Sequence, residues 1–187
     1  MRTFLCIPIS ERHREFLAHT AMRIRSMTHM RASWVPQDNY HITLRFLGDM
    51  DPSLIVDLDR CCRDVAARIG PFECTLDRIG AFPSPDRARV IWVGGALSPS
   101  FERLAHKLSS GLSELGFPPT KRESVIHATL ARIKDRPDPV LPEVISQLSP
   151  IQPLSVVIDR MVLMESTLTA QGSAYTPLFT KPLGGTG

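Results

Sequence analysis

Apolar and polar residues alternate along the first half of the chain, and the period of each stretch indicates its secondary structure. Alternation every second residue predicts strands, and spacing of three or four residues predicts helices. The expected strands are Arg2 to Ser10, Tyr40 to Leu47, Phe72 to Ile79 and Arg89 to Val93. Two helices are expected between them: Ser10 caps one from Glu11 towards Met27, and Asp51-Pro52 begins one that Gly70-Pro71 ends.

The second half of the chain repeats this plan. Leucines at helical spacing after Ser98-Pro99 predict a helix that Gly116 ends, and a shorter helix is expected from Val140 to Leu148. The expected strands are Ser124 to Ile133, Leu154 to Glu165 and Tyr175 to Thr180. Each half thus combines several strands with two helices, and we expect an α+β fold.

One tetrapeptide occurs in both halves, as His41-Ile42-Thr43-Leu44 and as His127-Ala128-Thr129-Leu130. With 6 His, 12 Thr and 20 Leu in 187 residues, composition alone gives two copies about one time in a thousand. The copies begin 86 residues apart, close to half the chain length. We therefore expect a single two-lobed domain over residues 1–187 with pseudo-duplicated halves. Largely antiparallel sheets would line a central cleft, with helices on the outer faces.

Composition narrows the classes of function. A hydrophobic content of 43% and a net charge of +3 are ordinary for a globular chain. This charge suits a polyanionic substrate but is too small for a charge-driven nucleic-acid binder. No apolar stretch is long enough to span a membrane, and Phe4 to Ile9 is too short for a secretory signal. The four cysteines lack CxxC spacing, which predicts buried or idle thiols in a reducing compartment. A cytoplasmic protein is expected.

The repeated motif carries groups suited to phosphodiester chemistry. Residues i and i+2 of a strand share a face, so each copy presents one imidazole and one hydroxyl on the same side. Imidazole titrates near pH 6.5, so a neutral ring can accept a proton from water while a charged ring donates one to the departing oxygen. Threonine hydroxyls can donate to non-bridging phosphate oxygens. A cyclic phosphodiester is anionic and strained, so this chemistry requires no metal.

The residues around both motifs resemble the LigT-like RNA 2′,3′-cyclic phosphodiesterases of the two-histidine phosphoesterase superfamily. The resemblance covers nearly the whole length and is most specific in two extended motifs, His41 to Gly48 and His127 to Arg132. The supporting matches are Arg2-Thr3-Phe4-Leu5, Trp34-Val35, Phe82-Pro83, Val90-Ile91-Trp92-Val93, Glu165-Ser166 and Tyr175. One departure is Ile126, where the family commonly has proline; we expect it to alter entry into the strand and not the chemistry.

The resemblance implies a role for each matching residue. His41 would be the general acid on the ribose 3′-oxygen and His127 the general base that activates water. Thr43, Thr129 and Arg132 would bind the phosphate, and Phe46 would stack on the terminal base. The implied reaction opens a 2′,3′-cyclic phosphate at an RNA end to leave a 2′-phosphate. No metal or cofactor is implied, the partner is an RNA end, and we expect a monomer.

Two of these assignments conflict with plain strand geometry. Phe46 and Arg132 are each five residues past a motif histidine, so strict alternation turns them to the opposite face. By alternation Arg45, not Phe46, shares the side of His41. Phe46 and Arg132 reach the histidines only where each strand bends, bulges or ends.

The sequence is also consistent with other interpretations of its function. The same scaffold would also suit reversible 2′–5′ RNA joining, cleavage of a small cyclic nucleotide, or binding of an RNA end without catalysis. The residues Arg87, Arg89, Lys121 and Arg122 either form a basic rim for an RNA tail or lie on a solvated surface. Two histidines without Cys, Asp or Glu at ligand spacing fall short of a metal site. The remaining histidines, His13, His19, His29 and His106, are expected to be surface or capping residues.

Overall fold

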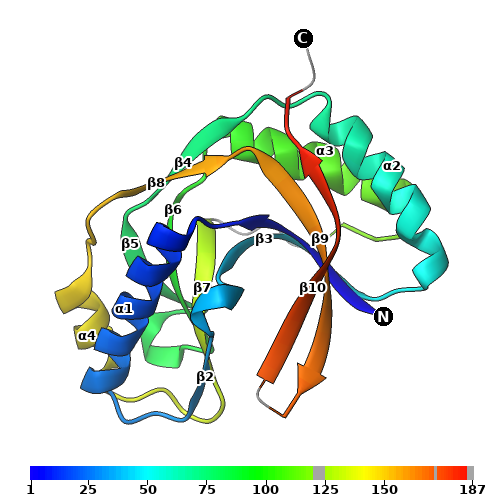
Figure 1. Cartoon of the computed structure of the whole chain (residues 1–187). Coiled ribbons are helices and arrows are strands. Elements are labelled where there is room, and N and C mark those ends of the chain that lie inside the picture. The colour runs from blue at the N-terminus through cyan, green and yellow to red at the C-terminus, as the bar shows by residue number, and fades with distance from the viewer. Residues whose placement is uncertain (120–124, 171, 185–187) are drawn as a thin grey trace.

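The computed structural model describes residues 1–119, 125–170 and 172–184, which form two antiparallel sheets and four α-helices (Figure 1). The strands are β1 (Arg2–Pro8), β2 (Ala32–Trp34), β3 (His41–Asp49), β4 (Phe72–Leu76), β5 (Arg78–Phe82), β6 (Val90–Ala96), β7 (Val125–Ile133), β8 (Leu154–Ile158), β9 (Arg160–Thr169) and β10 (Gly172–Pro182). The helices are α1 (Glu11–Met27), α2 (Ile55–Ala66), α3 (Pro99–Glu114) and α4 (Leu141–Leu148). This confirms the expected α+β class.

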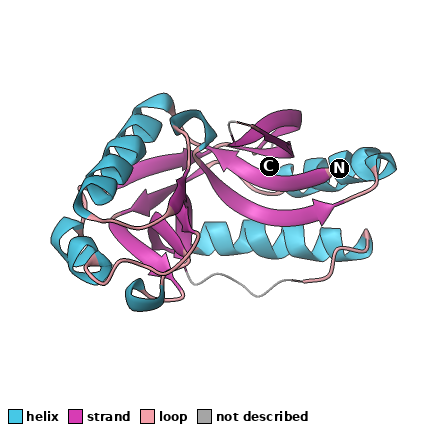
Figure 2. Cartoon of the chain, turned by 90° about the horizontal axis from the view of Figure 1, so that it is seen from below, coloured by secondary structure: helices cyan, strands magenta, loops and turns pink. Residues whose placement is uncertain are grey.

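The larger sheet joins the two halves of the fold. Its strands follow the order β10-β9-β1-β3-β7-β6-β5, with β2 added beside β7, and a smaller sheet pairs β4 with β8. Helices α1 and α4 pack against the β7-β6-β5 half, while α2 and α3 pack together and α2 contacts β9 and β10. The helices therefore lie on the outside of the strands, on opposite sides of the molecule (Figures 1 and 2). Helix α1 follows β1 and leads into β2, and it packs against β7.

The helices begin where the sequence indicates. The hydroxyl of Ser10 accepts a hydrogen bond from the His13 amide at 3.4 Å, and that of Ser98 accepts one from the Phe101 amide at 3.2 Å. Each serine satisfies an amide that the first helical turn leaves unpaired. The apolar stripe of α3 is fully buried at Leu104, Leu108 and Leu112. Burial of this stripe fixes α3 in the hydrophobic core.

Two expected strands are each divided between the sheets, so both predictions were wrong. Phe72 to Ile79 splits into β4 and β5 at Asp77, and Leu154 to Glu165 splits into β8 and β9 at Asp159. The backbone at each corner is hydrogen-bonded to a distant segment, because Asp77 accepts from the Ile151 amide and Asp159 from the Leu183 amide. The apolar pattern continues across both corners, so periodicity alone does not reveal them. The single aspartate inside each run was the local signal.

Three of the four cysteines are buried, as predicted. Cys6, Cys62 and Cys74 are buried, Cys61 is half-buried, and all four are free. Burial raises the pKa of the Cys6 and Cys62 thiols, which disfavours the reactive thiolate. Among the described residues no helix combines the length and the apolarity that crossing a membrane requires.

Candidate active site

Strands β3 and β7 bring the two motifs together. They pair antiparallel through Ile42 and Ala128, the central residues of the two copies. Continuing this register by one residue places Thr43 opposite His127 and His41 opposite Thr129. The two histidines are then diagonal neighbours on one face, with Cβ atoms roughly 7 Å apart. Ile42 and Ala128 point to the other side and are buried in the core. We call the face that carries the motif histidines and threonines the site face.

The ring of His41 is held by hydrogen bonds at both nitrogens. Its Nδ1 lies 2.7 Å from the carbonyl oxygen of Asn39, and its Nε2 lies 3.1 Å from the hydroxyl of Thr43. A carbonyl only accepts, so Nδ1 carries a proton and donates it to Asn39. In the neutral ring Nε2 accepts from the Thr43 hydroxyl, and in the charged ring it becomes a second donor. Nε2 is therefore the nitrogen that exchanges a proton.

Two aromatic rings enclose His41. Phe4 stacks on the imidazole with ring centroids 4.8 Å apart, and Tyr175 meets it edge-on at 5.5 Å. Burial lowers the pKa of His41, and the positive charges of Arg132 and His127 lower it further, while the Asn39 hydrogen bond opposes these effects. The charged form of the His41 ring is thus disfavoured in the ligand-free protein.

His127 has a matching aromatic environment from the other half of the fold. Phe82 meets its ring edge-on at 5.0 Å, and the Trp92 ring lies at 6.1 Å. Trp92 lies flat across the neighbouring strand because Gly80 has no side chain. A Cβ atom added at Gly80 would be 2.3 Å from the indole ring. The glycine therefore makes room for the aromatic wall beside His127.

Replacement of Gly80 by alanine is expected to displace Trp92. Overpacking of this kind costs about 1–3 kcal/mol of unfolding free energy, which urea denaturation measures. Gly70→Ala is the matched control, because a Cβ atom there meets nothing within 4 Å; its effect should stay within about 0.5 kcal/mol. Equal stabilities of the two variants would contradict the proposed fit between Gly80 and Trp92.

A β-bulge follows the threonine of each motif. On β7 the partners of Trp92 and Ile91 are Thr129 and Ala131, so Leu130 is an extra residue. On β3 the partners of Cys6 and Leu5 are Thr43 and Arg45, so Leu44 is extra in the same way. The fourth residue of the repeated tetrapeptide is thus the bulged residue in both strands. A bulge shifts the alternation of every residue that follows it.

These bulges resolve the conflict with strand geometry. Phe46 pairs with Phe4, which stacks on His41, so Phe46 lies on the site face. Arg132 pairs with Val90, two residues from the partner of Thr129, so it shares the face of Thr129. Both side chains are exposed there. The alternation-based placement of Arg45 beside His41 was wrong.

Arg45 instead points to the helix side of the sheet. It pairs with Leu5, a core residue, and only 9% of it is exposed. Its guanidinium donates to the carbonyl of Pro118. The structure therefore brings together all six residues expected in the site, namely His41, Thr43, Phe46, His127, Thr129 and Arg132.

Sequence reasoning missed the groups that surround the histidines. The carbonyl of Asn39 fixes the orientation of His41, and Phe4, Tyr175, Phe82 and Trp92 form the aromatic walls. The signal for Trp92 was the glycine on the adjacent strand, which marks a close approach. Within the described ranges, no group of three His, Cys, Asp or Glu side chains is arranged to hold a metal ion.

A sheet that presents two His-X-Thr pairs side by side on one face defines the site of a two-histidine phosphoesterase. The family described as LigT like Phosphoesterase matches this chain over residues 7–92 and 96–175. The chain therefore belongs to the LigT-like phosphoesterase family.

Individual relatives agree with this assignment. The chain is 34% identical to the RNA 2′,3′-cyclic phosphodiesterase of Aeropyrum pernix, over 90% of this chain and 91% of that protein. The crystal structure of TT0787 of Thermus thermophilus is similar with a TM-score of 0.79 and 26% identity, covering 98% of both chains. The structure of Escherichia coli LigT complexed with 3′-AMP is similar with a TM-score of 0.71 and 25% identity, covering 97% of both chains.

Proposed function

We propose that this protein hydrolyses the 2′,3′-cyclic phosphate at the end of an RNA strand and leaves a 2′-phosphate. The observation that carries the proposal is the Ile42–Ala128 pairing, which sets two imidazoles and two hydroxyls on one face. The Aeropyrum pernix relative named as an RNA 2′,3′-cyclic phosphodiesterase and the nucleotide bound to LigT support this choice of substrate.

In this proposal each half of the site has a separate task. His127 accepts a proton from water as the water oxygen attacks phosphorus, and the bond from phosphorus to the ribose 3′-oxygen breaks. His41 donates its Nε2 proton to that oxygen. Thr43, Thr129 and Arg132 bind the non-bridging oxygens, on which negative charge grows. Phe46, which is 56% exposed on the site face, stacks on the terminal base.

Substrate binding favours protonation of His41. In the ligand-free protein the pKa of His41 lies below its usual range, because of burial and the nearby Arg132 charge. An anionic phosphate on the site face offsets the Arg132 charge and favours the charged imidazole. Substrate binding therefore converts His41 into the acid that the reaction needs.

Removal of the Arg132 charge is expected to raise the pKa of His41. The guanidinium disfavours the imidazolium, so in Arg132→Gln the charged form persists to higher pH than in the wild type. Titration of the His41 ring by NMR, in the absence of ligand, measures both values. In the wild type the midpoint should fall below 6.5. A wild-type midpoint above that value, or a downward shift in Arg132→Gln, would contradict this electrostatic account.

Product analysis separates the proposed reaction from its alternatives. A 5′-labelled RNA with a terminal 2′,3′-cyclic phosphate should give a 2′-phosphate end, and EDTA should leave the rate unchanged because no step uses a metal. Ligation would appear as a longer 2′–5′-linked strand when an acceptor with a 5′-hydroxyl is present. Binding of the end without any turnover, or a rate that chelation abolishes, would refute the proposed function.

A further inference from the structure

A basic cavity lies at the edge of the larger sheet, next to the strand that carries Arg132. It has a volume of about 320 Å³ and lies between the C-terminal end of α1, strand β2 and the residue that follows β7. Its walls include Arg25, Arg31 and Lys134, together with the ring of Trp34. We call the cavity defined by these four residues the basic cavity.

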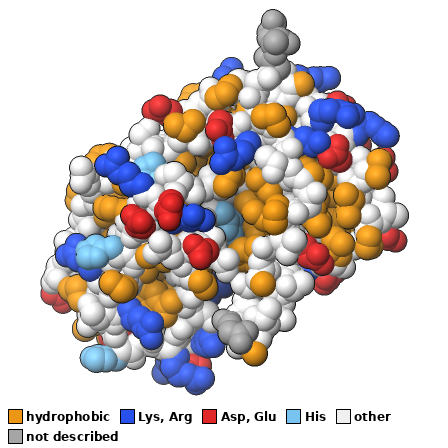
Figure 3. Space-filling model, in the orientation of Figure 1, with side chains coloured by type: hydrophobic (Ala, Val, Ile, Leu, Met, Phe, Trp, Pro, Cys, Tyr) orange, Lys and Arg blue, Asp and Glu red, His pale blue; other side chains and the backbone are white. Residues whose placement is uncertain are grey.

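The basic cavity gathers positive charge that its surroundings leave largely uncompensated. Among the described residues, Arg25 and Lys134 have no acidic side chain within ion-pairing distance, and Arg31 pairs only with Asp135 at 3.0 Å. The other nearby carboxylate, Asp138, accepts from the backbone amide of His29. Figure 3 shows Lys and Arg side chains gathered at this lower end of the molecule. Like charges repel, so such a cluster favours a polyanion.

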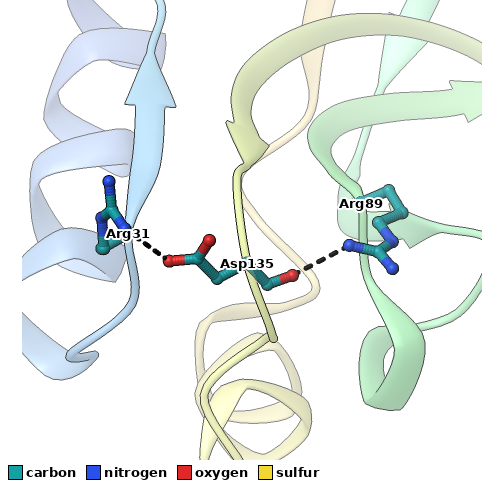
Figure 4. A network of polar contacts seen from close by, with 3 residues as sticks. All are labelled: Arg31, Arg89 and Asp135. Carbon is teal, nitrogen blue, oxygen red and sulfur yellow. Dashed lines mark hydrogen bonds and ion pairs between the residues drawn. The ribbon is translucent and has the colours of Figure 1, made fainter.

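Arg31 forms an ion pair at the rim of the basic cavity, where 78% of its side chain is exposed. Its Nη1 donates to the Asp135 carboxylate, and the Asp135 carbonyl accepts from Nη1 of Arg89 at 2.9 Å (Figure 4). The backbone supports the same arrangement, because the Lys134 amide donates to the Arg31 carbonyl and the Ile133 amide to the Arg89 carbonyl. A guanidinium has five N–H groups, so Arg31 keeps donors for a ligand.

The basic cavity is close to the proposed phosphate clamp. Ser33 of β2 pairs with Arg132 on the site face, whereas Trp34 pairs with the buried Ala131 and therefore lies on the helix side of the sheet. Paired strands are about 4.8 Å apart, and Lys134 is two residues, or about 7 Å, beyond Arg132 along the chain. A stacked nucleotide advances about 3.4 Å along its strand. An RNA strand with a phosphate bound at Arg132 would therefore reach the basic cavity by passing the end of β7 at Lys134, a path of at least about two to four nucleotides.

We propose that the basic cavity is a second RNA subsite, which binds a backbone phosphate and a base upstream of the cyclic phosphate. This inference rests on the proposed function and extends it from the terminal nucleotide to the strand. Arg25, Arg31 and Lys134 contact the phosphate, and Trp34 provides an aromatic surface on which a base stacks. Cations combined with an aromatic ring are the usual means of binding single-stranded nucleic acid. The preferred substrate is then an oligonucleotide and not a mononucleoside cyclic phosphate.

The test compares substrates of different length that share one terminal nucleoside. Cytidine 2′,3′-cyclic phosphate and RNAs of two and six nucleotides ending in the same group are assayed for kcat/KM. In the wild type the hexanucleotide should exceed the mononucleotide about fivefold or more, since one stacked base contributes at least this much. The double variant Arg25→Ala/Lys134→Ala should remove most of this gain and leave mononucleotide turnover within about twofold.

Arg23→Ala is the matched control, since Arg23 is an exposed arginine on α1 that does not line the basic cavity. It should keep the full length dependence. The salt dependence of KM for the hexanucleotide should become shallower by about 0.7 per lost phosphate contact in the double variant only. Equal kcat/KM for short and long substrates, or a gain that survives the double variant, would overturn the subsite.

A binding assay separates failure of the subsite from failure of the proposed function. Labelled hexanucleotide ending in a 2′-phosphate is titrated with the wild type and the double variant by fluorescence anisotropy. If no cyclic phosphate is turned over, the proposed function fails, but weaker binding by the double variant still supports the subsite. Unchanged binding by the double variant, or equal displacement by polyglutamate or inorganic phosphate, shows that the basic cavity does not recognise RNA. Lys121 and Arg122, also expected near an RNA tail, lie outside the described residues.

Discussion

Alanine in place of either motif histidine is expected to lower kcat/KM for an RNA cyclic phosphate by about 10²- to 10⁴-fold. In the proposed mechanism His41→Ala removes the proton donor for the 3′-oxygen, and His127→Ala removes the base that activates water. The two effects should not multiply in the double variant, because the rings act as a unit in one reaction. Single-turnover assays with a 5′-labelled RNA measure the losses.

Folding must be separated from chemistry in these variants. Both histidines are only half-buried, so we expect each variant to retain the wild-type circular dichroism spectrum. His106→Ala serves as the matched control, because His106 is an exposed residue on α3 with no place on the site face. Its activity should equal that of the wild type. If a folded His41→Ala or His127→Ala protein kept more than a tenth of wild-type activity, paired acid–base catalysis would be wrong.

Arg132→Ala is expected to lower kcat/KM by about 10²- to 10³-fold, the usual cost of losing one donor that stabilises charge in a transition state. Arg132 lies on the site face because of the Leu130 bulge, and its charge acts on His41. Arg132→Lys should recover only part of the loss, since a lysine ammonium cannot bind two phosphate oxygens through a planar fork.

The same kinetic assay distinguishes a phosphate clamp from a general surface charge. Arg23→Ala removes an equal charge from the exposed face of α1 and should leave kcat/KM unchanged. Equal losses in Arg132→Ala and Arg23→Ala would assign the effect to net charge. Full recovery by lysine would show that bidentate geometry is not needed.

Strands β3 and β7 could be predicted because the sequence pattern that indicates each of them is local. A repeated motif in an apolar run indicates a strand, and alternation puts His41 beside Thr43 and His127 beside Thr129. The N-termini of α1 and α3 could also be predicted, because the capping serines Ser10 and Ser98 are local sequence signals. The α+β class followed from the strands and helices expected in both halves of the chain.

The bulges could not be predicted, because a bulge is a property of two strands. Leu44 and Leu130 are ordinary apolar residues in sequence, and they become extra only relative to β1 and β6. The position of Arg132 depends entirely on this mismatch. The same reason applies to the Asp77 and Asp159 corners, where the partner strands, and not the hydrophobic pattern, decide where each strand ends.

Backbone groups also orient the site residues, and the residue types do not reveal where these groups lie. The Asn39 carbonyl holds the proton on Nδ1 of His41, and any residue at that position would supply a carbonyl. The chain places it there through the 3₁₀ turn Gln37–Asn39. The Asn39 side chain in turn donates to the Ser173 carbonyl on β10 at 2.8 Å, which ties this turn to the strand that carries Tyr175.

A crystal structure with a bound nucleoside 2′-phosphate tests the central claim most directly. Both imidazoles should lie within hydrogen-bonding distance of the same phosphate, with His41 through Nε2, and Arg132 should contact its non-bridging oxygens. A phosphate bound by only one histidine, or one located away from the Ile42–Ala128 pairing, would contradict the account.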